Sequence, residues 1–360
     1  MDKGKMEKLN NYHVLFLIQN VMISMNFIRL PHVIHESGRD MWLIPIAMGV
    51  IVQLLLIPML MLCGRFPNET LFSINRKLVG KYLGTFINLL LILYMVISVT
   101  SIVDDFIEVI QTIALGRVNK TLLFIPLLLL TLYILSGGIK TVARTCVLAF
   151  FMTVWMIYFL NWTFEPAKFT SVIPLFEVGA KPFFHSLFLG FESMLGFELV
   201  LFFFPFIINK KESFKYVTGG VWLTVFIYTL VCLACVVYFS EWQIGNIRYP
   251  ILSILRAVEF SFIERIESLG LSLWIFLILS TISAYLWVAK RGITDLSSGK
   301  SQSWQAYLVV MLVTIIFFLP IDRVTRETLY EWNRYFAFSF ILILPTFLLI
   351  TNLFRGGKPS

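Results

Sequence analysis

The dominant pattern along the chain is a series of long apolar runs that are separated by short polar segments. Each run is about 20 residues long, which is the length that a helix needs to cross a lipid bilayer. The pattern therefore predicts an all-α polytopic membrane protein. We expect ten transmembrane helices, at about residues 12–33, 41–63, 84–113, 121–137, 145–163, 185–208, 216–239, 268–289, 304–321 and 333–354.

The sixth apolar run differs from a plain membrane anchor because it contains two glycines and two carboxylates. These are Gly190, Glu192, Gly196 and Glu198. A carboxylate at bilayer depth costs roughly 2.5–3.5 kcal/mol on insertion scales, so it usually faces a protein cavity or an ion path. Glycine weakens a helix by about 1 kcal/mol relative to alanine and lets the backbone open. We expect this run to form one wall of a site.

The ten expected helices divide into two sets of five, and an odd number in each set turns the second set upside down relative to the first. Transporters with such a five-plus-five inverted repeat carry their site where the first helix of each half is broken. The first repeat covers about residues 12–163 and the second about 185–354. No long linker interrupts the runs, so we expect residues 1–360 to form a single integral membrane, permease-like domain.

Helix one corresponds to helix six in this division, and it also carries signals of a break. Ser24 and Asn26 place polar groups in the middle of the run, and Pro31 removes an amide donor. We therefore expect helices one and six to be discontinuous. Ordinary hydrogen bonding between helices explains the two polar residues of helix one equally well.

Two segments between the runs predict short helices at the membrane surface. Segment 64–84 begins with Arg65 and a proline turn, and we expect it to form a helix on the inner face. Segment 249–259 is amphipathic and lies between helices seven and eight. Its apolar face consists of Ile251, Ile254, Leu255 and Val258, opposite Arg256 and Glu259. This outer helix could cap the site, contact a partner or lie passively on the surface.

Composition and charge agree with a membrane protein. The chain is 58% hydrophobic and only 14% charged, which lies outside the range of soluble domains. Its net charge of +8 could suggest a nucleic-acid partner. However, the excess of Lys and Arg falls in the loops on the side of the N-terminus, as the positive-inside rule requires if both termini are cytoplasmic. The basic charge therefore reflects membrane orientation, and we expect no nucleic-acid partner.

The sequence contains no motif for catalysis. We find no phosphate-binding loop, nucleotide fingerprint, metalloprotease helix or nucleophile elbow. The four histidines lie at the ends of the apolar runs without a partner at catalytic spacing. The four cysteines lie in or beside apolar runs, which favours packing over metal or redox chemistry. We expect no catalytic residue, no cofactor and no metal site.

Three stretches carry a resemblance to a known family. They are Arg65-Phe66-Pro67 with the downstream Leu78–Gly84 segment, the helix-six stretch from Ser193 through Gly196 and Glu198, and Tyr249-Pro250-Ile251-Leu252-Ser253 followed by Phe262-Ile263-Glu264-Arg265 and Trp274. In these stretches the chain resembles the permease-like B subunits of spore nutrient-germinant receptors, within the amino acid-polyamine-organocation transporter superfamily. The ten-helix layout agrees with this family along essentially the whole chain.

The resemblance implies a ten-helix, inverted-repeat bundle of the spore inner membrane. Such a subunit binds a small nutrient, typically an amino acid, and works with a receptor A subunit and a lipoprotein C subunit. By analogy with such folds the ligand would lie between helices one, three, six and eight. The candidate contacts are then Ser24, Asn26, Tyr94, Phe191, Ser193, Leu195, Thr281 and Tyr285. Glu198 matches a carboxylate of the family.

The chain departs from the family at helix one. Where relatives carry Gly-x-Gly, this chain has Ser24-Met25-Asn26. Glycines there would let backbone amides approach a substrate carboxylate. Side chains in that space favour a smaller or differently oriented ligand, a ligand other than an amino acid, or loss of binding. Glu192 also stands where we expect an apolar residue, which could suit an amine or a cation.

Each candidate residue also has a structural explanation. Phe191, Leu195 and Tyr94 could serve packing, whereas Ser193 and Thr281 could bond their own helix backbone. A carboxylate such as that of Glu198 could bind exposed helix amides rather than carry a proton. For the whole chain, the alternatives to a receptor subunit are a proton- or sodium-coupled secondary transporter of amino acids or amines, and a scaffold subunit that has lost its ligand.

Overall fold

The chain folds as a bundle of helices. The computed structural model describes residues 8–115, 118–164, 178–258, 266–297 and 302–354. Within these ranges the only pairing of extended segments is an isolated bridge between Leu9 and Ile207, which ties the start of helix one to the end of helix six. Of the three stretches that carry the family resemblance, the part at 262–265 lies outside the described residues.

Ten apolar helical segments cross the bundle, as the sequence predicts. Six are long single helices, namely α3 (Leu43–Arg65), α5 (Lys81–Ile110), α7 (Ile139–Thr153) with its 3₁₀ extension to Leu160, α11 (Ser213–Tyr238), α14 (Ile266–Leu296) and α16 (Arg323–Phe354). Two are shorter, namely α6 (Lys120–Ser136) and α15 (Ser303–Phe317). The last two segments are bent pairs. By length and composition, the described residues contain six helices that can cross a membrane, or eight if each bent pair forms one span, and the two shorter apolar helices complete the ten predicted segments.

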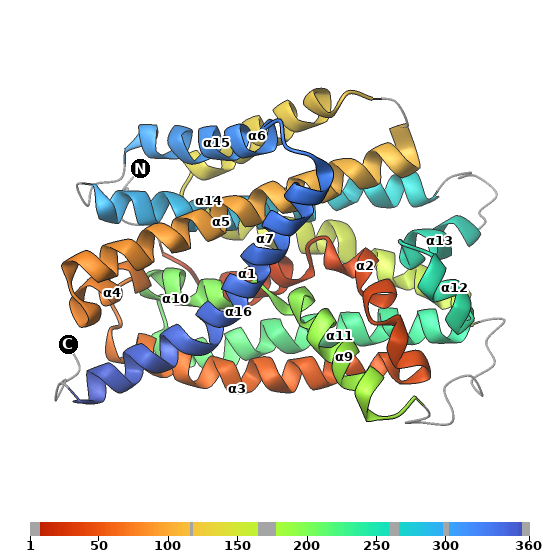
Figure 1. The fold of residues 1–360 in the computed structure, drawn as a ribbon, viewed down its shortest axis with the longest axis horizontal. Helices are drawn as coiled ribbons and strands as arrows, with labels where there is room; N and C mark the ends of the chain where they lie inside the picture. The colour runs from red at the N-terminus through yellow and green to blue at the C-terminus, as the bar shows by residue number, and fades with distance from the viewer. Residues whose placement is uncertain (1–7, 116–117, 165–177, 259–265, 298–301, 355–360) are drawn as a thin grey trace.

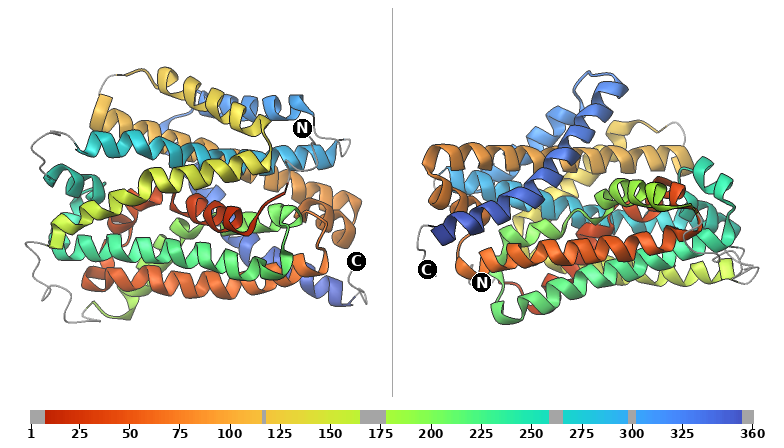
Figure 2. Two further views of the ribbon diagram at one scale, coloured as in Figure 1. Left: turned by 180° about the vertical axis from the view of Figure 1, so that it is seen from behind. Right: turned by 60° about the horizontal axis from the view of Figure 1, so that its bottom comes forward.

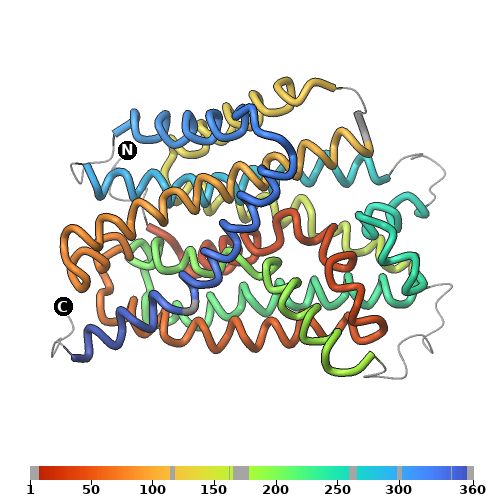
Figure 3. The backbone as a smooth tube through the Cα atoms, in the orientation of Figure 1, coloured from red at the N-terminus to blue at the C-terminus, as the bar shows by residue number. Residues whose placement is uncertain are grey.

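The two bent pairs are helices one and six, which confirms the predicted breaks. α1 (Asn11–Ile23) meets α2 (Asn26–Val33) at an angle of 49°. In helix six, the segment Ala180–Met194, which begins with α9 (Ala180–Gly190), meets the segment Phe197–Phe206 around α10 (Val200–Phe203) at 44°. Figure 3 shows the change in direction of the chain between α1 and α2.

The broken helices lie in the middle of the bundle. α6 and α15 lie side by side along one edge, and α3 and α11 lie together on the opposite side (Figures 1 and 2). α1 is enclosed by α7, α11 and α14. α16 crosses the other long helices obliquely, packing on α3 and α5 (Figure 1). This arrangement places the two breaks at the same depth, surrounded by continuous helices.

The two predicted surface helices are both present. α4 (Leu71–Val79) follows helix two and buries Leu71, Phe72, Ile74 and Leu78 against α5. α13 (Pro250–Ala257), preceded by the short α12 (Glu241–Asn246), buries its apolar face and leaves Arg256 exposed. α13 packs on α2 and α14, so it lies against the far half of the broken helix one.

α1 and α11 approach each other closely because α11 carries a glycine at their contact. A Cβ atom added to Gly220 would lie 2.6 Å from the carbonyl oxygen of Leu15 and 3.0 Å from the Cβ of Ile18. The neighbouring Gly219 is less constrained, because an added Cβ there would meet only the flexible end of the Leu15 side chain, at 3.3 Å. The position of the broken helix one therefore depends on the absence of a side chain at Gly220.

We predict that Gly220→Ala lowers the free energy of unfolding by about 1–3 kcal/mol, as overpacking of a close contact does. Gly219→Ala is the matched control, since it gains the same helix propensity without meeting backbone, and it should stay within about 0.5 kcal/mol of the original protein. Unfolding of the detergent-purified proteins measures both. Equal stability of the two variants would contradict the close approach of α11 to α1.

Candidate functional site

The break in helix one is centred on Ser24. This residue has φ +28° and is the one described non-glycine residue with a positive φ. Side chains rarely adopt this region of backbone space, which glycine occupies at no steric cost. Its hydroxyl is buried without a hydrogen-bond partner among the described residues. Ser24 thus holds a conformation that suits the glycine expected from the family pattern, and it places an unsatisfied polar atom at the break.

The break in helix six is centred on Gly196, whose φ of +123° requires glycine. The 3₁₀ turn Phe191–Met194 ends there, and the turn Phe197–Leu199 begins directly afterwards. A Cβ atom on Gly196 would lie 2.7 Å from Cγ1 of Val21 and 3.0 Å from its carbonyl carbon. Two observations therefore require glycine at this position, namely its positive φ and its close contact with Val21. The two broken helices touch at this residue.

The carboxylate of Glu198 joins the helix-six break to two other helices. Its side chain is fully buried. One oxygen accepts the backbone N–H of Gly196 at 2.6 Å. The other accepts the hydroxyl of Tyr94 on α5 at 2.8 Å and that of Tyr285 on α14 at 3.3 Å. A carboxylate that accepts hydrogen bonds from three different elements connects them. The structural role of Glu198, the alternative to proton transfer, stays a prediction.

A cavity of about 70 Å³ lies beside the two breaks. Of the residues expected to contact a ligand, Ser24, Asn26, Tyr94, Leu195 and Tyr285 line it, and so does Glu192. Pockets for drug-sized molecules typically measure about 300–1,000 Å³. In this conformation the cavity therefore admits only a small solute.

Three residues of the expected set do not line this cavity. Phe191 packs edge-on against Phe338, with ring centroids 5.6 Å apart. The hydroxyl of Thr281 lies 2.9 Å from the carbonyl oxygen of Leu277 one turn earlier. Ser193 is buried within the 3₁₀ turn before the break. These positions agree with the packing and backbone-bonding alternatives, and a ligand contact at any of the three stays a prediction.

The cavity also has lining residues that the sequence did not single out, and several come from α16. Tyr330, Asn333 and Arg334 line it, and Asn333 donates a hydrogen bond of 2.9 Å to the hydroxyl of Ser98 on α5. From the family resemblance we expected the ligand to lie among helices one, three, six and eight. Arg334 is a charged residue at the start of the tenth apolar run. This charge could have indicated from the sequence that helix ten also lines the cavity.

A vestibule of about 830 Å³ lies next to the cavity, and two ion pairs mark the boundary between them. Arg29 on α2 contacts Asp105 on α5 at 2.7 Å. Arg334 on α16 contacts Glu192 of the helix-six 3₁₀ turn at 2.6 Å. Asp105, Glu192 and Arg334 line both spaces. Glu192 is therefore paired with an arginine in this conformation, and the two pairs separate the cavity from the vestibule.

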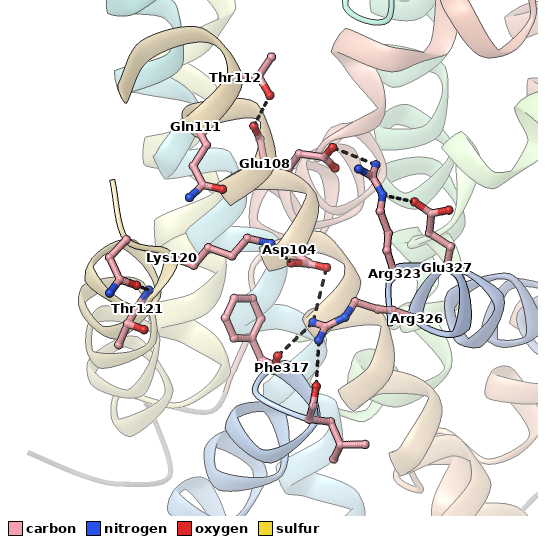
Figure 4. Close-up of polar contacts among 12 residues, drawn as sticks. Asp104, Glu108, Gln111, Thr112, Lys120, Thr121, Phe317, Arg323, Arg326 and Glu327 are labelled. Carbon is pink, nitrogen blue, oxygen red and sulfur yellow. Dashed lines mark hydrogen bonds and ion pairs between the residues drawn. The ribbon is translucent and has the colours of Figure 1, made fainter. Parts of the chain in front are cut away.

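The wall of the vestibule is a second charged network, which connects α5 to the start of α16 (Figure 4). Arg323 contacts Glu108 at 3.1 Å, and Arg326 contacts Asp104 at 3.7 Å. Arg326 also donates to the carbonyl oxygens of Phe317, the last residue of α15, and Leu319, which follows the helix. The exposed Asp322 caps α16 by accepting the hydroxyl and amide of Thr325, and these bonds lower the pKa of its carboxyl.

The helical bundle with two discontinuous helices is a fold that solved membrane transporters share. The structure is similar to that of a Na⁺-coupled sialic acid symporter, with a TM-score of 0.64 at 13% identity over 96% of this chain and 78% of that chain. It is also similar to MhsT in complex with L-phenylalanine, with a TM-score of 0.66 at 12% identity over 96% and 89% of the two chains.

The chain belongs to the spore germination protein family, whose profile matches residues 8–326. Among its relatives is spore germination protein GerQB of Bacillus cereus, which is 25% identical over 95% of both chains. Spore germination protein A2 of Bacillus subtilis is 24% identical over 95% of this chain and 94% of its own. The family resemblance found from three sequence stretches is confirmed, and so is the expected helical fold.

We predict that breaking the boundary pair opens the cavity to the vestibule. Asn26→Cys places a thiol in the cavity, and the four native cysteines are buried. Its reaction with a hydrophilic maleimide should become several-fold faster when Arg334→Gln is added. Arg323→Gln is the matched control, because this arginine lies on the same helix but pairs in the vestibule wall. Equal rates in both double variants would show that the Arg334 pair does not close the cavity.

Proposed function

We propose that this chain is the nutrient-binding membrane subunit of a spore germinant receptor, and that it acts with an A subunit and a lipoprotein C subunit in the spore inner membrane. The observation that carries this proposal is the cavity at the two helix breaks, which is lined by residues from both breaks and bounded by two ion pairs. Membership of the spore germination protein family supplies the biological context.

The chemistry of the cavity suits a small zwitterion such as an amino acid. Asp105 and Glu192 offer carboxylates to an ammonium group, and Arg334 offers a guanidinium to a carboxylate, all at the boundary of the cavity. Asn26, Ser98 and Asn333 add polar groups along its wall. The small volume favours a small side chain on the ligand, in agreement with the filled helix-one position at Ser24.

The ion pairs also suggest how binding becomes a signal. A ligand changes a conformational equilibrium only by preferring one state over the other. A zwitterion that bonds Glu192 and Arg334 competes with their mutual pair, so it favours a state in which α16 and the helix-six turn have moved apart. With both termini cytoplasmic, the vestibule faces away from the cytoplasm and gives the nutrient access to this boundary.

The test is a cavity variant in spores that depend on this receptor alone. Asn26→Leu keeps the size of a cavity-lining side chain and removes its polar atoms, which should raise the nutrient concentration for half-maximal germination about 2–10-fold, the value of one hydrogen bond. Gln53→Leu is the control, because its amide bonds Thr218 away from the cavity. An unchanged response to every nutrient of a screening panel, at normal protein level, would contradict the proposed site.

A secondary transporter remains the second candidate, and the similarity to a Na⁺-coupled symporter favours it. The two functions differ in what crosses the membrane. Uptake of labelled amino acid into proteoliposomes, driven by a proton or sodium gradient and abolished by Glu198→Gln, would establish transport. We expect binding without accumulation, because Glu198 is held by three hydrogen bonds in a structural role.

A further inference from the structure

The hydroxyl group of Tyr228 lies among three main-chain carbonyl oxygens in the centre of the bundle. Tyr228 belongs to α11 and is fully buried. Its oxygen lies 2.8 Å from the carbonyl oxygen of Met22, 3.1 Å from that of Ile23 and 3.3 Å from that of Ser193. One side chain therefore meets the main chain of both broken helices, and it comes from a different helix than the two tyrosines that contact Glu198.

The three carbonyl groups carry negative potential because they belong to helix ends. α1 ends at Ile23, and the 3₁₀ turn that contains Ser193 ends at Met194. The last carbonyls of a helix lack the amide donors of a following turn, and they form the negative end of the helix dipole. A phenol has a single O–H proton, so it donates fully to only one of the three carbonyls at a time.

Such a group of carbonyls is a recognised type of cation site. In transporters with broken helices, the unwound carbonyls and the C-terminal ends of half-helices coordinate the coupling ion. In this protein the Tyr228 hydroxyl occupies the space between the carbonyls in which such an ion would lie. Its oxygen is within hydrogen-bond distance of all three carbonyl oxygens. These residues therefore do not fit a bound sodium ion, although they form the surroundings that would hold one.

The packing of α11 fixes the hydroxyl in this place. Gly220, Thr224 and Tyr228 follow one another at intervals of four residues, so they lie on one face of the helix. Gly220 meets the backbone of Leu15, and the Thr224 hydroxyl lies 3.4 Å from the carbonyl oxygen of Gln19. This face follows α1 up to its break, where Tyr228 reaches the carbonyls of Met22 and Ile23.

We propose that the Tyr228 hydroxyl takes the place of a coupling cation and holds the two helix breaks together. The protein then keeps its broken helices assembled without Na⁺, and its conformational equilibrium responds to the ligand of the cavity alone. The proposal concerns a different place from the cavity, and its test needs no nutrient. A negative result for Tyr228 would therefore not contradict the proposed receptor function. A negative result for the receptor function would likewise not contradict the proposed role of Tyr228.

The experiment compares thermal unfolding of the detergent-purified chain in NaCl and in choline chloride at equal ionic strength. We expect the original protein to unfold at the same temperature in both salts. Tyr228→Phe should unfold about 2–4 °C lower in choline chloride, and NaCl should restore the midpoint with saturation, because the freed carbonyls accept the cation. Thr229→Val is the matched control on the same helix, since within the described part of the chain its hydroxyl bonds the Val225 carbonyl alone, and it should show neither effect.

Three results would overturn the proposal. The first is a saturable rise of the unfolding temperature with Na⁺ in the original protein, because the three carbonyl groups would then still bind a cation. The second is a Tyr228→Phe variant as stable as the original protein in choline chloride. The third is a destabilised Tyr228→Phe variant that sodium does not restore, since Tyr228 would then be an ordinary hydrogen-bond donor and not a substitute for an ion.

Discussion

The carboxylate of Glu198 is the contact on which the rest of the site depends. An ionised group in the middle of a membrane bundle is costly, and a helix break adds backbone groups without partners. Glu198 resolves both problems at once, because its oxygens accept the exposed amide of Gly196 and the hydroxyls of Tyr94 and Tyr285. The break is thereby held at a fixed distance from α5 and α14, which are two of the long continuous helices.

This contact belongs to a part of the site that buried contacts hold in place. Gly196 lies against the backbone of Val21, Glu198 accepts hydrogen bonds from the two tyrosine hydroxyls, and Tyr228 contacts the carbonyl ends of both breaks. The other part of the site is bounded by partly exposed ion pairs, which join Arg29 and Arg334 to Asp105 and Glu192. Such pairs contribute little stability when they are solvated, so they can separate at small cost. The proposed receptor function needs this combination of a fixed cavity and a boundary that can open.

The sequence predicted the parts of this structure that follow from local patterns. Apolar runs located the ten helical segments, and Gly190 through Glu198 marked the helix-six break. α13 (Pro250–Ala257) lies within the amphipathic segment predicted at 249–259, of which Glu259 is outside the described residues. Ser24 and Asn26 were expected at the helix-one break and do lie there. Each of these predictions depends on residues that are close together along the chain.

The remaining features depend on which face of an apolar helix points inward. A helix that is hydrophobic all round carries no moment that orients it, so the sequence could not decide between a ligand contact and a backbone bond for Thr281, and it did not indicate that Tyr228 meets two breaks. The ion pair between Glu192 and Arg334 joins residues that are 142 positions apart. Contacts of this kind depend on the oblique path of α16 across the other helices. No pattern of neighbouring residues in the sequence predicts that path.

A double-mutant cycle between Glu198→Gln and Tyr94→Phe measures whether Glu198 couples the helix-six break to α5. The free energy of unfolding is measured for the original protein, both single variants and the double variant in detergent. We expect a coupling energy of about 0.5–3 kcal/mol, as for residues in one hydrogen-bond network. Strictly additive losses would contradict it, because they would mean that the carboxylate and the tyrosine stabilise the protein independently.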